Sequence, residues 1–223
     1  MSLYDSYGEY KEYQVPSLSK KDIARFDTEI WQPANCQDGA RFLEIGAGTG
    51  QFLLYLAHKK VRSFQGIDLD PALLNVMPAE VKNNFSCYNV WEFLNKPQEN
   101  YDHIIMLDVL EHFTADEGAD LLRKLKAILL PGGQIIVKVP NAASPWGLNY
   151  QYSDLTHKTA FTSNSLRQLA KASGYNVRMV YEQKRGSQRR QISDSLVNGF
   201  LKWALLTPPE FFGANLYMII YSV

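Results

Sequence analysis

The chain has 223 residues, of which 46% are hydrophobic, and its 23 basic and 23 acidic side chains give zero net charge. This length and composition predict one domain with a sizeable core. The charge balance argues against bulk nucleic acid as a partner. The sequence shows no apolar run of the roughly 20 residues that cross a bilayer, no signal peptide and no metal spacing of its two cysteines, which predicts a reduced, cytoplasmic protein.

Strand-like and helix-like segments alternate along the chain, which predicts an α/β fold with a parallel sheet covered by helices. Residues 1–35 form an N-terminal segment with a helix from Lys20, and the main domain spans residues 36–223. The expected strands are Phe42–Ile45, Ser63–Ile67, Phe85–Tyr88, Ile104–Leu107, Gln134–Val139, Asn176–Glu182 and Asn215–Ser222. One expected helix of the main domain ends at Lys59, and a second begins at Pro71. A third spans Ala115 to Leu129, and a fourth spans Ser163 to about Ser173 with Thr162 or Ser163 as N-cap.

Three glycines connect the first predicted strand to its helix. Gly46, Gly48 and Gly50 stand at alternate positions and permit a sharp turn whose backbone comes close to a ligand. The helix that follows offers its N-terminal amides to that ligand. A dinucleotide fingerprint places its third glycine three residues after the second, where this chain has Gln51, so the spacing disfavours NAD. Glu44 would repel a pyrophosphate and attract an ammonium or sulfonium group.

An acidic residue ends the second predicted strand. Asp68, in the segment Gly66–Asp70, follows the first glycine at about the interval expected for a carboxylate that binds both ribose hydroxyls. With the glycine turn, and with Tyr101–Phe113 and Leu129–Asn141 in the places of strands four and five, this pattern resembles the class I S-adenosylmethionine (SAM)-dependent methyltransferases. The resemblance covers about Ala40 to Tyr181. It implies a Rossmann-like, seven-stranded, mostly parallel sheet with an antiparallel last strand and helices on both faces.

The resemblance also implies a cofactor and the residues that bind it. The cofactor is SAM, and the product is S-adenosylhomocysteine. Glu44 and the glycine turn would hold the methionine part, Asp68 the ribose, and the residues after the second and third strands the adenine. The implied residues are Glu44, Gly46, Ala47, Gly48, Gly50, Asp68, Leu69, Asn89, Val90, Asp108 and Val109.

Two of the four histidines are candidates for a general base. If ligands lie beyond the carboxyl ends of the strands, His112 and His157 fall on the ligand side, whereas His58 and His103 do not. In the resembling family the loop after the fifth strand holds the acceptor, which favours His157, with Asp154 to orient it and His112 as the second candidate. A histidine there can take the proton of an attacking hydroxyl. The alternative is a loop histidine that caps a helix or binds the backbone.

The residues after the fourth strand have a second interpretation. Asp108, Glu111 and His112 would share one face of a helical turn, and together with His157 they offer ligands that suit a divalent cation. Some members of the resembling family carry such a site with E-x-x-E-H spacing. Because the first acid here is the shorter aspartate, we favour a role in lining the cofactor pocket, without a metal.

Both ends of the chain carry features of their own. Tyr4, Tyr7, Tyr10 and Tyr13 precede the first helix, in a segment that the resembling family often uses as a lid and that is otherwise a surface helix packed on the sheet. Residues 184–206 join a basic stretch to an apolar one. The favoured interpretation is a solvated loop followed by a core helix, and peripheral contact with an anionic membrane is the alternative.

The sequence thus predicts a SAM-dependent methyltransferase that acts on an oxygen of a small-molecule or glycan-related acceptor. The insert before the last strand also loosely resembles that of bacterial methyltransferases associated with surface polysaccharides. Two other functions stay open at this point. One is a SAM-binding interaction protein without turnover, and the other is an NAD-dependent oxidoreductase, which the glycine spacing disfavours.

Overall fold

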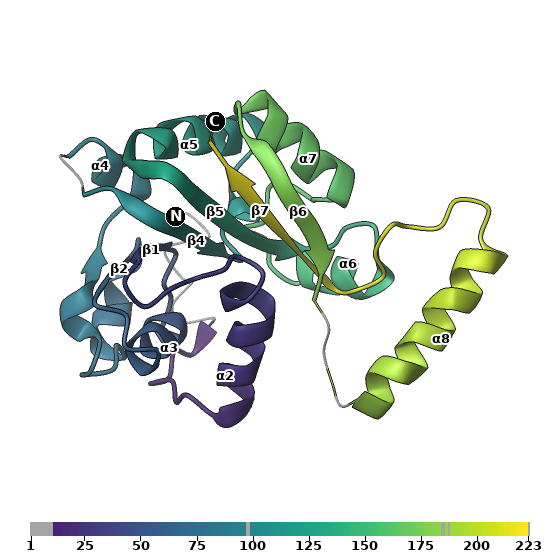
Figure 1. Cartoon of the computed structure of the whole chain (residues 1–223), viewed down its shortest axis with the longest axis horizontal. Coiled ribbons are helices and arrows are strands. Elements are labelled where there is room, and N and C mark those ends of the chain that lie inside the picture. Colours follow the sequence, from purple (N-terminus) through teal and green to yellow (C-terminus); the bar gives the residue numbers. More distant parts are fainter. Residues whose placement is uncertain (1–10, 97–98, 184–185, 187, 223) are drawn as a thin grey trace.

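The computed structural model describes residues 11–96, 99–183, 186 and 188–222 (Figure 1). Within these residues, seven strands form one sheet in the order β3-β2-β1-β4-β5-β7-β6, and β7 runs antiparallel to both of its neighbours while the other pairs are parallel. The strands are β1 Arg41–Ile45, β2 Ser63–Asp68, β3 Phe85–Cys87, β4 Tyr101–Leu107, β5 Leu129–Pro140, β6 Asn176–Glu182 and β7 Asn215–Tyr221. The predicted α/β fold with an antiparallel last strand is confirmed.

Local sequence signals mark where several helices begin. In the described part of the chain the α-helices are α2 Lys20–Phe26, α3 Gln51–His58, α4 Val90–Leu94, α5 Ala115–Leu125, α6 Pro145–Tyr152, α7 Ser163–Ala172 and α8 Gln188–Ala204, and the π-helix η2 spans Asp27–Trp31. Ser19 and Asp22 form a capping box at the start of α2, and Thr114 and Glu117 form another at the start of α5. Thr162 is the N-cap of α7 and accepts a hydrogen bond from the backbone of the helix.

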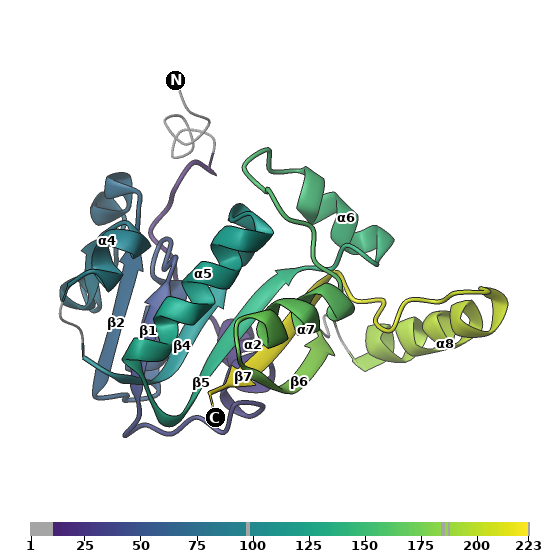
Figure 2. The same ribbon diagram turned by 90° about the horizontal axis from the view of Figure 1, so that it is seen from above.

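Helices cover both faces of the sheet, because its central strands are apolar on both sides. Successive residues of a strand point to opposite faces. Ile104 and Met106 of β4 belong to one buried cluster with α5 and α7, whereas Ile105 between them belongs to a second cluster with α2 and α3. Figure 2 shows the corresponding layers, with α5 and α7 on one side of the sheet and α2 on the other.

Some predicted boundaries differ from those observed. β5 begins at Leu129 rather than Gln134, because residues 131–133 bulge within the strand instead of turning the chain before it. The helix predicted from Pro71 is a short 3₁₀ helix, and the predicted long helix ends at Leu125 with a 3₁₀ turn after it. These differences do not move the carboxyl ends of the strands, where the candidate site lies.

Part of the N-terminal segment belongs to the core. Phe26 of α2 is buried, and its ring centroid lies 5.1 Å from that of Phe52 in α3. The buried carboxylate of Glu29, in η2, accepts hydrogen bonds of 2.9 Å from Gln183 and 2.5 Å from Tyr217, and so connects this segment to the far strands. The tyrosines of the predicted lid that lie outside the described residues are Tyr4, Tyr7 and Tyr10. The lid role stays a prediction.

The helix α8 stands apart from the rest of the molecule (Figure 1). Its large apolar side chains, including Phe200 and Trp203, are exposed. The interpretation of this apolar stretch as a core helix is therefore wrong, because these side chains do not enter the core. Within the described residues, no helix combines the length and the apolar character that spanning a membrane requires.

Candidate active site

The glycine turn lies at the carboxyl edge of the sheet, between β1 and α3. Gly46, Gly48 and Gly50 have φ angles of 74°, 52° and 86°, in the left-handed region that favours glycine. A Cβ on Gly46 would lie 2.3 Å from Cγ2 of Val109, whereas a Cβ on Gly48 would meet no atom within 4 Å. The turn is thus packed on one side and leaves open space at its middle glycine, where a ligand can approach the backbone.

Asp68, at the end of β2, is bonded to this turn. Its Oδ2 accepts a hydrogen bond of 2.9 Å from the Gly48 amide, and its Oδ1 accepts one of 3.2 Å from the Asp70 amide. Burial raises the pKa of Asp68, while these hydrogen bonds act in the opposite direction. A carboxylate oxygen can accept more than one hydrogen bond, so Asp68 can also accept from ribose hydroxyls.

Glu44, in β1, is a buried acid with an unsatisfied oxygen. The residue is 3% exposed, and its Oε2 has no hydrogen-bond partner among the described residues. Burial, together with the negative charge of Asp68, raises the pKa of Glu44 well above its ordinary value. An unsatisfied buried polar group costs about 1–3 kcal/mol, so a cationic ligand beside it is favoured. The turn and Glu44 therefore fit SAM, which carries an ammonium and a sulfonium group.

The other residues of the predicted cofactor site follow β2 and β3. Leu69 is exposed beside Asp68. Asn89 is the N-cap of α4, where its Oδ1 accepts a hydrogen bond of 2.9 Å from the Trp91 amide, and Val90 is the first residue of that helix. The amide NH₂ group of Asn89 lies outside that bond and can donate to a ligand. The structure thus gathers these predicted residues at the same edge as the glycine turn.

Asp108 follows β4 with a φ of 57°, a left-handed value that is unusual for a residue other than glycine. Its Oδ2 lies 2.5 Å from Nζ of Lys138, which pairs in register with Leu107 across β4 and β5. Lys138 is not among the site residues predicted from the sequence, although a lysine within an apolar parallel strand is a recognisable signal. The strained backbone and the ion pair hold the Asp108 carboxylate at the end of the strand.

A cavity of about 300 Å³ opens beside Asp108. Its lining residues are Lys11, Asp108, Glu111, His112, Lys138, Pro140, Tyr150, Ser153, Asp154, His157 and Asn215. Both candidate general bases are among them. The cavity connects the end of β4 to the loop after β5, which is where an acceptor would lie next to the cofactor.

His157 has one ring nitrogen bonded to the backbone. Its Nδ1 lies 2.9 Å from the carbonyl oxygen of Gln151, which can only accept, so Nδ1 carries the proton of the neutral ring. The lone pair is therefore on Nε2, which lies 4.0 Å from Oε1 of Glu111. Glu111 is fully buried, and burial together with the charge of Asp108 raises its pKa well above the ordinary value. In its ionised form, Glu111 at this distance stabilises the imidazolium that forms when Nε2 takes up a proton.

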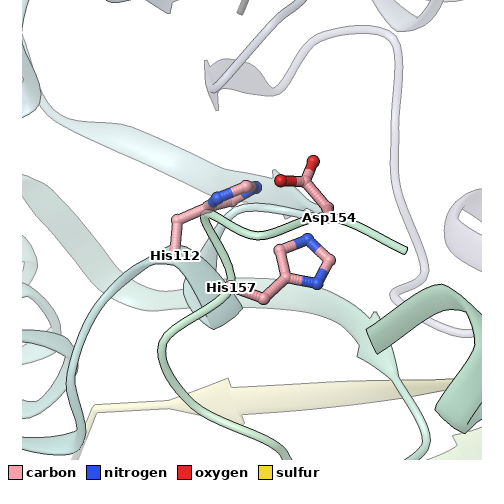
Figure 3. A group of neighbouring side chains, drawn as sticks. All are labelled: His112, Asp154 and His157. Atoms are coloured by element: carbon pink, nitrogen blue, oxygen red, sulfur yellow. The ribbon is translucent and has the colours of Figure 1, made fainter. Parts of the chain in front are cut away.

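His112 is held by a chain of hydrogen bonds. The Thr156 hydroxyl donates to Asp154 at 2.6 Å and lies 2.9 Å from Nδ1 of His112, which must therefore donate to it. Asp154 also pairs with Lys11 at 3.1 Å. Burial and the neighbouring charge of His157 lower the pKa of His112 to about 4. Figure 3 shows His112, Asp154 and His157 gathered in one group, in which the two rings stand edge to face with centroids 4.6 Å apart.

The structure changes the role expected of Asp154. The sequence predicts that it orients His157, but Nδ1 of that ring is hydrogen-bonded to the Gln151 carbonyl. Asp154 accepts instead from the amide and hydroxyl of Thr156, because an aspartate readily caps the turn that it begins. Thr156 directly precedes His157 in the sequence, so its hydroxyl could have been predicted as a hydrogen-bond partner in this loop. Lys11 is distant in sequence and gives no local signal.

Two lysines bear on the interpretation of this group of residues as a metal site. One ligand atom from each residue drawn in Figure 3 lies within 4.8 Å of the others, a spacing that can hold an ion. Lys11, however, pairs with Asp154, which is not among the predicted metal ligands, and Lys138 pairs with Asp108, which is. These ammonium groups already supply positive charge to both aspartates. They support the interpretation without a metal, which stays a prediction.

Comparisons with known proteins agree with this geometry. A family model described as a methyltransferase domain matches residues 13–180, about three quarters of the chain. The ubiquinone biosynthesis O-methyltransferase of a Bradyrhizobium species is 32% identical over 114 residues, which are 48% of this chain and 42% of that protein. The chain therefore matches less than half the length of this curated relative.

Solved structures share the fold. A SAM-dependent methyltransferase from Archaeoglobus fulgidus matches with a TM-score of 0.69 at 18% identity, over 98% of this chain and 99% of that one. The magnesium protoporphyrin IX methyltransferase of Synechocystis, solved with SAM bound, matches with a TM-score of 0.59 at 13% identity, over 99% of this chain and 91% of that one. The family match and this shared fold together show that the chain belongs to the class I SAM-dependent methyltransferases.

Proposed function

We propose that this chain transfers the methyl group of SAM to a hydroxyl oxygen of a small-molecule acceptor in the cavity, with His157 as general base. The observation that carries the proposal is the hydrogen bond from Nδ1 of His157 to the Gln151 carbonyl, which leaves the lone pair on Nε2. The name of the Bradyrhizobium relative, an O-methyltransferase, supports oxygen as the methylated atom. Glycan-related acceptors are the second class that the proposal includes.

The cofactor site is proposed to hold SAM by charge and by shape. SAM supplies a methyl group on a sulfonium, and transfer needs the acceptor oxygen, the methyl carbon and the sulfur held in line. Glu44 and the glycine turn hold the amino-acid part, which gives the buried acid a cationic partner. Asp68, whose carboxylate is already held by a hydrogen bond from the Gly48 amide, accepts hydrogen bonds from the ribose hydroxyls. Leu69 and Asn89 contact the adenine.

The segment before α2 is proposed to cover this site, as the lid prediction requires. Lys11 lines the cavity and pairs with Asp154 at the acceptor end. Tyr13 lies at the cofactor end, where burial and a hydrogen bond to Asp70 raise the pKa of its phenol. Contacts at both ends support a covering role for this segment, which would exclude water from the transfer.

The two histidines have different roles in this proposal. Nε2 of His157 removes the proton of the acceptor hydroxyl as its oxygen attacks, and Glu111 at 4.0 Å stabilises the resulting charge. His112 is a poorer base, because its pKa is lowered to about 4. Its Nδ1–H donates to Thr156, so His112 positions the loop that carries His157.

A panel of acceptors tests the proposal. Calorimetry with S-adenosylhomocysteine present would measure the binding of quinone precursors, nucleotide sugars and lipid-linked glycans, and turnover of the ligands that bind would follow. We expect at least one hydroxyl-bearing compound to be methylated. SAM binding without turnover of any ligand would instead support an interaction protein, and preferential binding of NADH would support an oxidoreductase.

Replacing Asp68 tests the cofactor site. Asp68→Ala removes a charged acceptor, so we expect SAM binding to weaken by about 1.5–3 kcal/mol in calorimetry. Asp102→Ala is the matched control, because Asp102 bonds to the Arg41 amide at the opposite edge of the sheet and should leave SAM affinity unchanged. A folded Asp68→Ala protein with the affinity of the wild type would contradict the assignment.

The raised pKa of Glu44 predicts a pH dependence of SAM binding. The cationic ligand favours the ionised acid, so binding releases protons, and affinity rises with pH through the raised pKa of Glu44 and then levels off. Glu44→Gln should bind more weakly at neutral pH and show a shallower dependence, with Asp68 still titrating. Calorimetry over the acid range measures both slopes. Equal slopes in the two proteins would remove Glu44 from the site.

Chelation tests the absence of a metal. Because Lys11 and Lys138 neutralise the two candidate aspartates, we expect EDTA to leave turnover unchanged and added magnesium or zinc to give no increase. The metal content of the purified protein, measured by mass spectrometry before and after treatment, is the control. Loss of turnover on chelation that either ion restores would establish a metal-dependent site.

Replacing His157 tests the general base. His157→Ala should lower turnover by about 10²–10⁴ while SAM affinity stays nearly intact. Added imidazole should restore part of the activity if the ring acts as a base, whereas a purely structural histidine would not respond. His157→Ala with near wild-type turnover would show that the loop histidine only binds the backbone.

A further inference from the structure

The helix α8 presents apolar side chains to solvent. It is inserted between the carboxyl end of β6 and the start of β7, and it projects from the body in both views (Figures 1 and 2). Several of its large apolar residues lie outside the hydrophobic core, as their exposed fractions show: Ile192 63%, Leu196 72%, Phe200 61% and Trp203 81%. A helix on the surface of a protein normally packs such residues against the hydrophobic core of that protein.

These side chains share one face of the helix. Ile192, Leu196 and Phe200 follow one another at intervals of four residues, which places them on one face, and Trp203 follows at three. The rings of Phe200 and Trp203 lie together with centroids 5.9 Å apart. Ser195 and Asn198 stand between these positions. An amphipathic helix this exposed gains little stability in water alone, so its apolar face requires a surface to cover it.

The charge of the segment indicates which surface that is. Residues 184–206 contain five basic residues and one acidic residue, in a chain whose net charge is zero. A second copy of the same chain would bring two such basic segments together, which like-charge repulsion disfavours. An anionic lipid surface attracts them, because its negative potential acts on every basic residue near it. Tryptophan and phenylalanine next to basic residues are typical of helices that lie in the membrane interface.

We propose that α8 docks on the surface of an anionic lipid bilayer. Its apolar face enters the boundary between headgroups and acyl chains, and Arg189, Arg190 and Lys202 lie near the lipid phosphates. Without lipid, Arg190 pairs with Asp194 of the same helix at 2.9 Å. The helix lies in the plane of the interface and does not cross the membrane. Nothing in this docking requires methyl transfer, so it is independent of the function proposed for the cavity.

The position of α8 also orients the cavity toward the lipid. α6 follows the carboxyl end of β5 and α8 follows the carboxyl end of β6, and these two strands run in the same direction because both are antiparallel to β7. Tyr150 of α6 lines the cavity, while Trp146 and Tyr152 of the same helix are exposed. The docked protein thus holds the cavity at the same end as the bilayer.

Sedimentation of the 223-residue chain with vesicles tests the proposal. Vesicles of phosphatidylcholine with phosphatidylglycerol are compared with vesicles of phosphatidylcholine alone, at low and high salt. We expect binding to the anionic vesicles that weakens with salt. Phe200→Ser with Trp203→Ser should weaken it by roughly tenfold or more, and Arg189→Gln with Arg190→Gln by about tenfold on anionic vesicles only.

Matched controls separate docking from misfolding and from self-association. Ser195→Ala changes the same helix outside the apolar face and should bind vesicles like the wild type. SAM affinity of every variant should equal that of the wild type, because α8 is distant from the glycine turn. The proposal is overturned if the wild type does not bind anionic vesicles or if the apolar variants bind as well as it does. It is equally overturned if light scattering shows a lipid-free dimer that the same variants dissociate.

Discussion

Parallel pairing of β1 with β2 and β4 is the constraint on which the rest of the site depends. It brings the carboxyl ends of three strands to one edge, where the glycine turn, Asp68 and Asp108 meet. The hydrogen bond from the Gly48 amide to Asp68 then fixes the turn against β2. β5 pairs with β4 and is followed by the loop of His157, so Lys138 and His157 line one cavity together with Asp108.

Three buried glutamates differ in how their carboxyl oxygens are hydrogen-bonded. Glu29 accepts hydrogen bonds from Gln183 and Tyr217, as a structural buried acid must. Glu44 and Glu111 have buried oxygens without such partners among the described residues, and burial raises the pKa of both. The pKa of each of these two glutamates is higher in the folded than in the unfolded chain. Their ionisation therefore lowers the free energy of unfolding as pH rises through the folded-state pKa. In the proposed function a cationic group offsets that cost at each position: SAM beside Glu44 and the imidazolium beside Glu111.

Most of the fold, and the shape of the cofactor site, follow from local sequence patterns. The glycine spacing specifies left-handed backbone that few other residues adopt, and an acid after a buried strand identifies Asp68. The contacts around the cavity are tertiary and leave no comparable pattern in the sequence. Lys11 reaches Asp154 from a distant segment, and the His157 ring bonds to a backbone carbonyl, a group that every residue has. The apolar residues of α8 are recognisable in the sequence, but their helical spacing is the same in a core helix and in an exposed one.

The central claim is that this chain moves a methyl group from SAM to oxygen. The most direct measurement is nuclear magnetic resonance of the product formed from SAM labelled with ¹³C in its methyl group, for an acceptor that binds the cavity. The account predicts one new signal at the chemical shift of a methyl ether, absent in His157→Ala over the same time. A signal at the shift of an N-methyl or C-methyl group, or consumption of SAM without a methylated product, would contradict it.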